Sequence, residues 1–117
     1  MGLKQVKPSA HFVVNICGDR WKVNLFSHAK FNKLFGECMG ICVYQHNINY
    51  RTINFRGPKV SRDTIAHELT HAFLSYKYFG NCKAATIEER VCEATGKSYK
   101  RLYQLTEFIY ATLREAV

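Results

Sequence analysis

The sequence predicts an α+β fold, in which a small antiparallel sheet packs on one helix that follows Ser61 and on a long C-terminal helix. Apolar runs rich in β-branched and aromatic residues fill the first half of the chain. Apolar residues at helical spacing, together with helix-capping signals, fill the second half. With 117 residues the chain can build one core and is too short for two, so we expect a single domain over residues 1–117.

Four strands are expected in the first half of the chain. They cover residues 11–16, 21–26, 41–45 and 50–55. Gly18-Asp19-Arg20 offers a turn within the first pair, and His46-Asn47-Ile48-Asn49 a turn within the second, because Asn tolerates left-handed conformations. Gly57-Pro58 ends the last strand. A short helix separates the two pairs, with Ser27 as its N-cap and Glu37 near its end.

Two longer helices are expected in the second half. Ser61 is a good N-cap for the first of them, and Gly80-Asn81 is a typical stop signal. Thr86 and Glu89 then match a capping box, so the last helix begins there and runs to about Arg114. Its apolar face is expected to contain Leu102, Leu105, Ile109 and Leu113.

One short motif in the first long helix points to chemistry. Residues 67–71 read His-Glu-Leu-Thr-His, which matches H-E-x-x-H. Residues four apart lie one turn apart on the same helix face, so the imidazoles of His67 and His71 can bind one zinc ion. Glu68 is rotated by about 100° around the helix axis and can therefore accept a proton from a metal-activated water beside the ion. The competing interpretation is a surface helix with two ordinary histidines.

A catalytic zinc ion usually has a third protein ligand. No histidine follows the motif, which excludes the longer H-E-x-x-H-x-x-G-x-x-H pattern. Glu88, Glu89 and Glu93 lie in the first turns of the last helix, which a short loop would return antiparallel to the motif helix. Glu88 is favoured because it shares the face with Val91 that is expected to turn inward, whereas Glu89 serves the capping box. The remaining alternatives are Cys82, Cys92 and His46. We expect Glu107 and Glu115 to be solvated surface charges.

The segments 64–73 and 88–94 resemble the minimal gluzincin-type metallopeptidases, and in particular the ImmA/IrrE family and its small phage-borne relatives. Members combine a small sheet, an H-E-x-x-H helix and a following helix that supplies a Glu ligand. The resemblance implies a zincin-like fold and hydrolysis of peptide bonds in a protein substrate. It implies zinc ligation by His67, His71 and Glu88, with Glu68 as the general base. Candidates for a residue that stabilises the transition state are Tyr76, Tyr99 and Tyr103.

The charge of the chain leaves the partner open. The formal net charge is +8, which permits an acidic protein or peptide as substrate. The 17 Lys and Arg residues are scattered, and no run is typical of a nucleic-acid-binding arm. A non-catalytic binding protein with a zincin fold is therefore the first alternative to a peptidase, and a basic nucleic-acid-binding protein is the less favoured one.

The N-terminal residues and the cysteines favour a cytoplasmic protein. Residues 1–8 contain no apolar stretch of the kind found in signal peptides, and no segment is apolar enough to span a membrane. The odd number of cysteines, five, argues against a disulfide framework. Cys38 and Cys42 have loose metal-ligand spacing, but no second pair follows, so we expect them to be structural.

Overall fold

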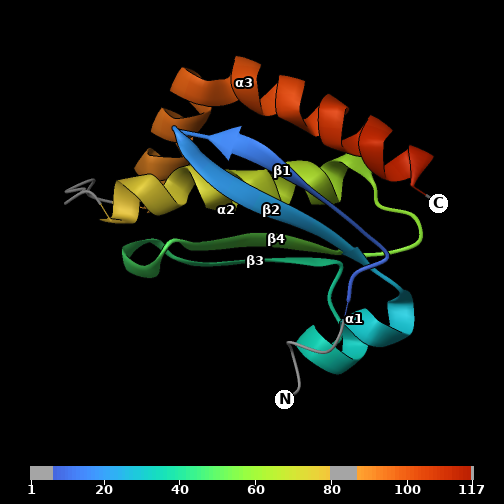
Figure 1. Ribbon diagram of the computed structural model, residues 1–117. Coiled ribbons are helices and arrows are strands. Elements are labelled where there is room, and N and C mark those ends of the chain that lie inside the picture. The colour runs from blue at the N-terminus through green and yellow to red at the C-terminus, as the bar shows by residue number, and fades with distance from the viewer. Residues whose placement is uncertain (1–6, 80–86, 117) are drawn as a thin grey trace.

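A four-stranded sheet with two long helices on one face forms the body of the molecule (Figure 1). The computed structural model describes the backbone of residues 7–79 and 87–116 and the side chains of residues 7–75 and 99–116. The strands are β1 (Ala10–Ile16), β2 (Asp19–Phe26), β3 (Gly40–Gln45) and β4 (Tyr50–Arg56). The helices are α1 (His28–Phe35), the short 3₁₀ helix η2 (His46–Ile48), α2 (Arg62–Phe79) and α3 (Ile87–Glu115). The predicted α+β class is therefore confirmed.

The order of the strands differs from the expectation. The two hairpins β1–β2 and β3–β4 are antiparallel, as predicted, but the sheet order is β1-β2-β4-β3 and the central pair β2–β4 is parallel. The prediction of an antiparallel sheet is thus wrong at its centre, and the sheet is mixed. Had β3 lain beside β2, all strands would have been antiparallel. Instead β4 takes the inner place, and its consecutive buried residues from Thr52 to Phe55 suit a strand covered on both faces.

The short helix α1 packs against the face of the sheet opposite to α2 and α3. Phe26 is the last residue of β2 and points away from the side of Leu25, because successive side chains alternate between faces. Its ring lies 5.9 Å from that of Phe35, and Phe35 lies 5.0 Å from the fully buried Phe31. Ser27 caps the helix as predicted, since its hydroxyl accepts a hydrogen bond from the amide of Lys30.

The hydrophobic core lies between the sheet and the helices α2 and α3. Strand residues at alternate positions face it, with Trp21, Val23, Ile53 and Phe55 fully buried. The apolar face predicted for the last helix is confirmed: Leu105, Ile109 and Leu113 are buried in the core, and Leu102 packs against it. The helix α2 contributes Ile65, Leu69, Ala72 and Phe73. This packing fixes the position of α2, and with it the motif, relative to the sheet.

Polar contacts fix the start of α2. The hydroxyl of Ser61 accepts a hydrogen bond from the amide of Thr64, which confirms the predicted N-cap. Arg62 donates through Nε to both carboxylate oxygens of Glu107 on α3, at 3.1 and 2.9 Å. Glu107 is therefore paired, contrary to the expectation of a merely solvated charge. The predicted signals at Gly80-Asn81 and Thr86 lie outside the described residues.

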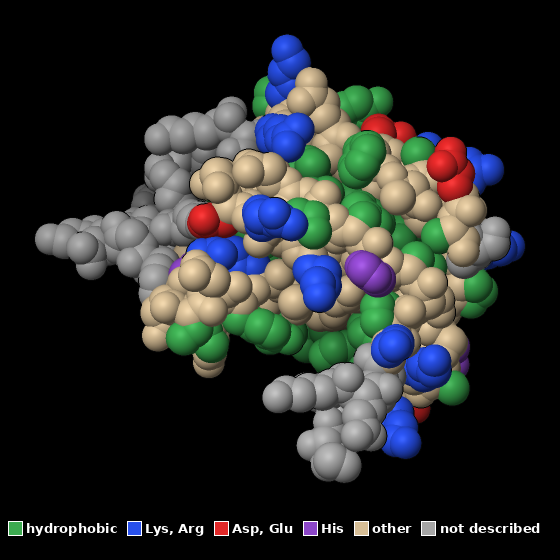
Figure 2. All heavy atoms as spheres, viewed as in Figure 1, with side chains coloured by type: hydrophobic (Ala, Val, Ile, Leu, Met, Phe, Trp, Pro, Cys, Tyr) green, Lys and Arg blue, Asp and Glu red, His purple; other side chains and the backbone are tan. Residues whose placement is uncertain are grey.

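Charged side chains are distributed over the surface. Figure 2 shows Lys and Arg spread over one face of the molecule without forming a single stripe. Across the described part of the chain, none of the helices combines the length and the apolarity that a bilayer crossing requires.

Candidate active site

The two motif histidines lie side by side on the solvent-facing surface of α2. Both side chains are exposed, and their rings meet edge to face with centroids 4.9 Å apart. Nε2 of His67 is 3.3 Å from Nε2 of His71, within hydrogen-bond distance if one ring is protonated at that nitrogen. The helical spacing thus brings together the two nitrogens that the sequence predicts as ligands.

The separation of these nitrogens fits a zinc ion. Two ligands at ~2.0–2.1 Å from a tetrahedral ion are about 3.3–3.4 Å apart, which matches the observed 3.3 Å between the His67 and His71 nitrogens. Among the described side chains, no group of three His, Cys, Asp or Glu residues converges in a way that could hold a metal ion. The predicted third ligand Glu88, and its alternatives Glu89 and Glu93, lie in the first turns of α3, where the side chains are outside the described residues.

Glu68 lies in a different environment from the two histidines. It is only 6% exposed, and its Oε2 is 3.8 Å from Nε2 of His67. Burial raises the pKa of the Glu68 carboxyl above its ordinary value, and His67, His71 and the backbone amide of Cys42 oppose that rise. A carboxylate at the edge of the histidine pair, partly stripped of water, is a stronger proton acceptor than an exposed one.

Strand β3 positions Glu68, a role that no motif in the sequence indicates. A Cβ atom on Gly40 would lie 3.1 Å from Cγ of Glu68 and 3.2 Å from Cδ1 of Phe55, so a larger residue would push the Glu68 side chain aside by a few tenths of an ångström. The amide of Arg56 bonds to the carbonyl of Met39, which sets the alternation of the β3–β4 ladder and turns the amide of Cys42 toward the free edge of the sheet. That amide is the one that donates to Glu68.

A cavity of about 400 Å³ opens beside the motif. Residues from three places line it: the start of β3 with the two residues before it, the first turn of α2, and the motif itself. They are Cys38, Met39, Gly40, Asp63, Thr64, His67 and Glu68. The cavity therefore leaves space for a bound group next to His67, a candidate ligand, and next to Glu68, the candidate base.

Other residues considered from the sequence lie elsewhere or have other contacts. His46 is engaged through both ring nitrogens, since Nδ1 accepts from Arg51 at 2.8 Å and Nε2 lies 3.0 Å from Oγ of Ser75. It is therefore not available as a third ligand. Burial, with a smaller contribution from Glu68, raises the pKa of the Cys42 thiol to about 12, so this group stays a neutral thiol.

The tyrosine candidates do not join the motif in the described part of the chain. Tyr99 and Tyr103 are each 65% exposed on α3, and neither lines the cavity beside His67. The side chains of Tyr76, Cys82 and Cys92 are outside the described residues.

Comparison with protein-family models, with curated proteins and with solved structures finds no match to this chain.

Proposed function

We propose that this protein is a zinc-dependent metallopeptidase with a zincin-like fold, which hydrolyses peptide bonds in a protein or peptide substrate. The observation that carries the proposal is the pairing of two exposed imidazoles at the spacing of zinc ligands with a buried carboxylate next to them. Two ordinary surface histidines would not require the neighbouring Glu68 to be buried, nor a glycine opposite it.

His67 and His71 would hold the ion through Nε2, and Glu88 would complete the set. When bound, the zinc ion supplies Lewis acidity, which polarises the scissile carbonyl and makes a water more acidic. Glu68 accepts the proton of the attacking water and delivers it to the leaving amine nitrogen. Burial helps the first transfer, because it raises the pKa of Glu68, and the amide of Cys42 orients the carboxylate.

The strand beside the site can bind an extended peptide by strand addition. Strand β4 cannot do this, because it is paired with β2 on one side and with β3 on the other. The free edge belongs to β3, which lies along α2. By the alternation of the ladder, Gly40 and Cys42 turn their backbone groups to this edge, where the amide of Cys42 already donates to Glu68.

The experiment that tests the proposal measures zinc and cleavage together. Zinc per chain is determined by elemental mass spectrometry, and cleavage by mass spectrometry of a digested proteome-derived peptide library. Wild type and Glu68→Gln should each contain one zinc ion, and His71→Ala should contain none. Library cleavage should fall at least ~10²-fold in Glu68→Gln, the usual contribution of a general base.

A matched control is His28→Ala, since His28 is an exposed histidine on α1. It should keep both zinc and cleavage. Absence of zinc from wild type after zinc is added would contradict the proposal and favour a metal-free binding protein. Cleavage that survives in Glu68→Gln would contradict the assigned base.

A further inference from the structure

A groove leads away from the motif along the start of α2. The cavity beside His67 shares Met39 and Asp63 with a second cavity of about 480 Å³. The second cavity shares Val60 and Tyr110 with a third, of about 410 Å³. Because each cavity shares lining residues with the next, the three adjoin one another in a row from the motif to the C-terminal end of α3, and we call this row the groove.

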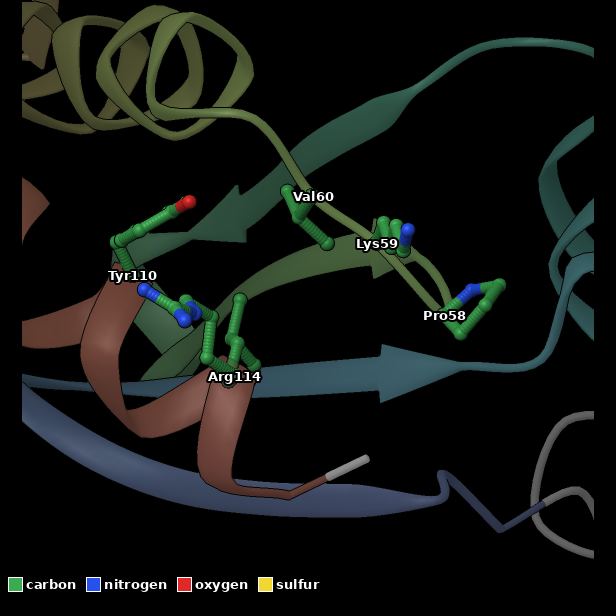
Figure 3. A pocket seen from close by; sticks show the side chains of 6 residues that line it. Pro58, Lys59, Val60, Tyr110 and Arg114 are labelled. Atoms are coloured by element: carbon green, nitrogen blue, oxygen red, sulfur yellow. The ribbon is translucent and has the colours of Figure 1, made fainter.

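The far end of this groove is positively charged. Its lining consists of Pro58, Lys59, Val60, Tyr110, Leu113 and Arg114, without a carboxylate. Figure 3 shows Arg114 and Tyr110 on α3 at one side of the cavity, and Lys59 and Pro58 on the segment before α2 at the other. Two cations from different parts of the chain thus line one cavity, and the guanidinium of Arg114 lies 5.6 Å from the centroid of the Tyr110 ring.

Neither cation is neutralised within the described residues. The Lys and Arg ion pairs found there join Arg51 with Asp19 and Arg62 with Glu107. Arg62 lies near the same end of α2 but is already bound to Glu107, whereas Lys59 and Arg114 have no acidic partner among the described side chains. The arrangement therefore leaves two positive charges for a ligand that carries a carboxylate.

We propose that Lys59 and Arg114 bind a carboxylate of the peptide substrate whose chain lies along this groove, and so select substrates with an acidic group at a fixed distance from the cleaved bond. This inference rests on the proposed peptidase function and names its substrate class. The carboxylate belongs either to an Asp or Glu side chain or to the C-terminus of the peptide, since both present the same group to a Lys–Arg pair.

Helix geometry gives the distance. Ser61 and His67 are six residues apart, which is about 9 Å along the axis of α2. An extended peptide advances ~3.3 Å per residue, so about three residues span that interval, and Lys59 lies just beyond Ser61. The acidic group is expected three to five residues, roughly, from the cleaved bond. Asp63 lines the groove between the two ends and disfavours an acidic residue nearer to the bond.

The first test measures binding without cleavage. Backbone amide signals of the Glu68→Gln variant are followed by NMR during titration with amidated hexaglutamate, amidated hexalysine, or hexa-alanine with a free C-terminal carboxylate. Hexaglutamate should shift signals at Lys59 and Arg114, and hexalysine should not. Adding Lys59→Glu and Arg114→Glu should weaken hexaglutamate binding about tenfold, from the loss of two ion pairs and the added repulsion.

The matched control is Lys33→Glu, an exposed charge reversal on α1 at the opposite face of the sheet. It should leave hexaglutamate binding unchanged. If Lys33→Glu weakens binding as much as the groove variants do, or if the shifts do not centre on Lys59 and Arg114, the proposal is overturned. Shifts with hexa-alanine alone would support the site and identify the C-terminal carboxylate as its ligand.

The second test reads cleavage specificity from the peptide library. Wild type should enrich Asp or Glu, or the peptide end, at one position three to five residues from the cut, roughly as the geometry gives. Lys59→Glu with Arg114→Glu should favour Lys or Arg there. Cleavage without any such preference would refute the acidic subsite and leave the peptidase standing. Groove-centred binding without cleavage in wild type would refute the peptidase and leave the carboxylate site standing.

Discussion

Gly40 and Glu68 are fitted to each other across the boundary between β3 and α2. A methyl group on Gly40 would lie 3.1 Å from Cγ of Glu68, closer than side chains normally pack. The buried carboxylate therefore depends on a strand residue that has no side chain at all.

Gly40→Ala should displace Glu68 and lower cleavage, while zinc binding by the exposed histidines persists. The overpacking should cost about 1–3 kcal/mol of unfolding free energy, measured by urea denaturation. The control is a double-mutant cycle with Glu68→Ala, which removes the atom that clashes. If Gly40→Ala is equally destabilising in the Glu68→Ala background, the contact between these two residues is not the cause.

His46 should make the protein less stable in mild acid. Burial, and next the charge of Arg51, lowers the pKa of His46, while Asp19 opposes the shift. Because the folded-state pKa lies below the unfolded value of 6.5, the unfolded chain binds the proton more readily. This contribution to stability is present above that value and is lost as pH falls through the folded-state pKa.

Urea unfolding at a series of pH values between about 8 and 5 checks this expectation. The unfolding free energy should fall less steeply with acidification in His46→Asn than in wild type. His28→Asn, which removes an exposed histidine, should retain the wild-type slope. Identical slopes in all three proteins would exclude His46 as the source of the pH dependence.

Glu88 should be required for zinc retention. Glu88→Ala removes the predicted third ligand and should lower zinc affinity by at least ~10-fold, measured by competition with a chromophoric chelator. Glu89→Ala and Glu93→Ala are matched controls from the same helix and should keep the metal. Loss of zinc from Glu89→Ala or Glu93→Ala, with Glu88→Ala intact, would reassign the ligand.

Ile109 should contribute much of the free energy with which α3 packs against the rest of the protein. It is fully buried against the core, so Ile109→Ala should lower the unfolding free energy by about 2–5 kcal/mol. Its chain neighbour Phe108 is 54% exposed, and Phe108→Ala should cost clearly less. Comparable losses in urea denaturation for the two variants would show that α3 is not packed through this face.

Local signals in the sequence account for most of the fold. Ser27 and Ser61 cap helices where the sequence placed them, because a cap depends only on residues within one turn. The two hairpins are also local, since each joins neighbouring strands. The parallel pair β2–β4 was missed because alternation of side chains tells which face a strand buries and says nothing about which strand lies beside it.

The candidate site was also predictable only where it depends on residues close together in the chain. His67, Glu68 and His71 follow from helical spacing, since one turn brings both imidazoles to one side. The parts supplied by β3 could not be read from the sequence. Gly40 acts because it has no side chain, and Cys42 acts through its backbone amide. Every glycine lacks a side chain and nearly every residue has a backbone amide, so neither feature identifies a functional residue in a sequence.

The parallel pairing of β2 with β4 also has a consequence for how the chain folds. Each hairpin closes a short loop and can form on its own, but joining Lys22 to Thr52 encloses α1 and β3 and carries a larger entropic cost. Formation of the central ladder is therefore expected to limit the folding rate. Substitutions that weaken the register between β2 and β4 should therefore slow refolding in stopped-flow experiments.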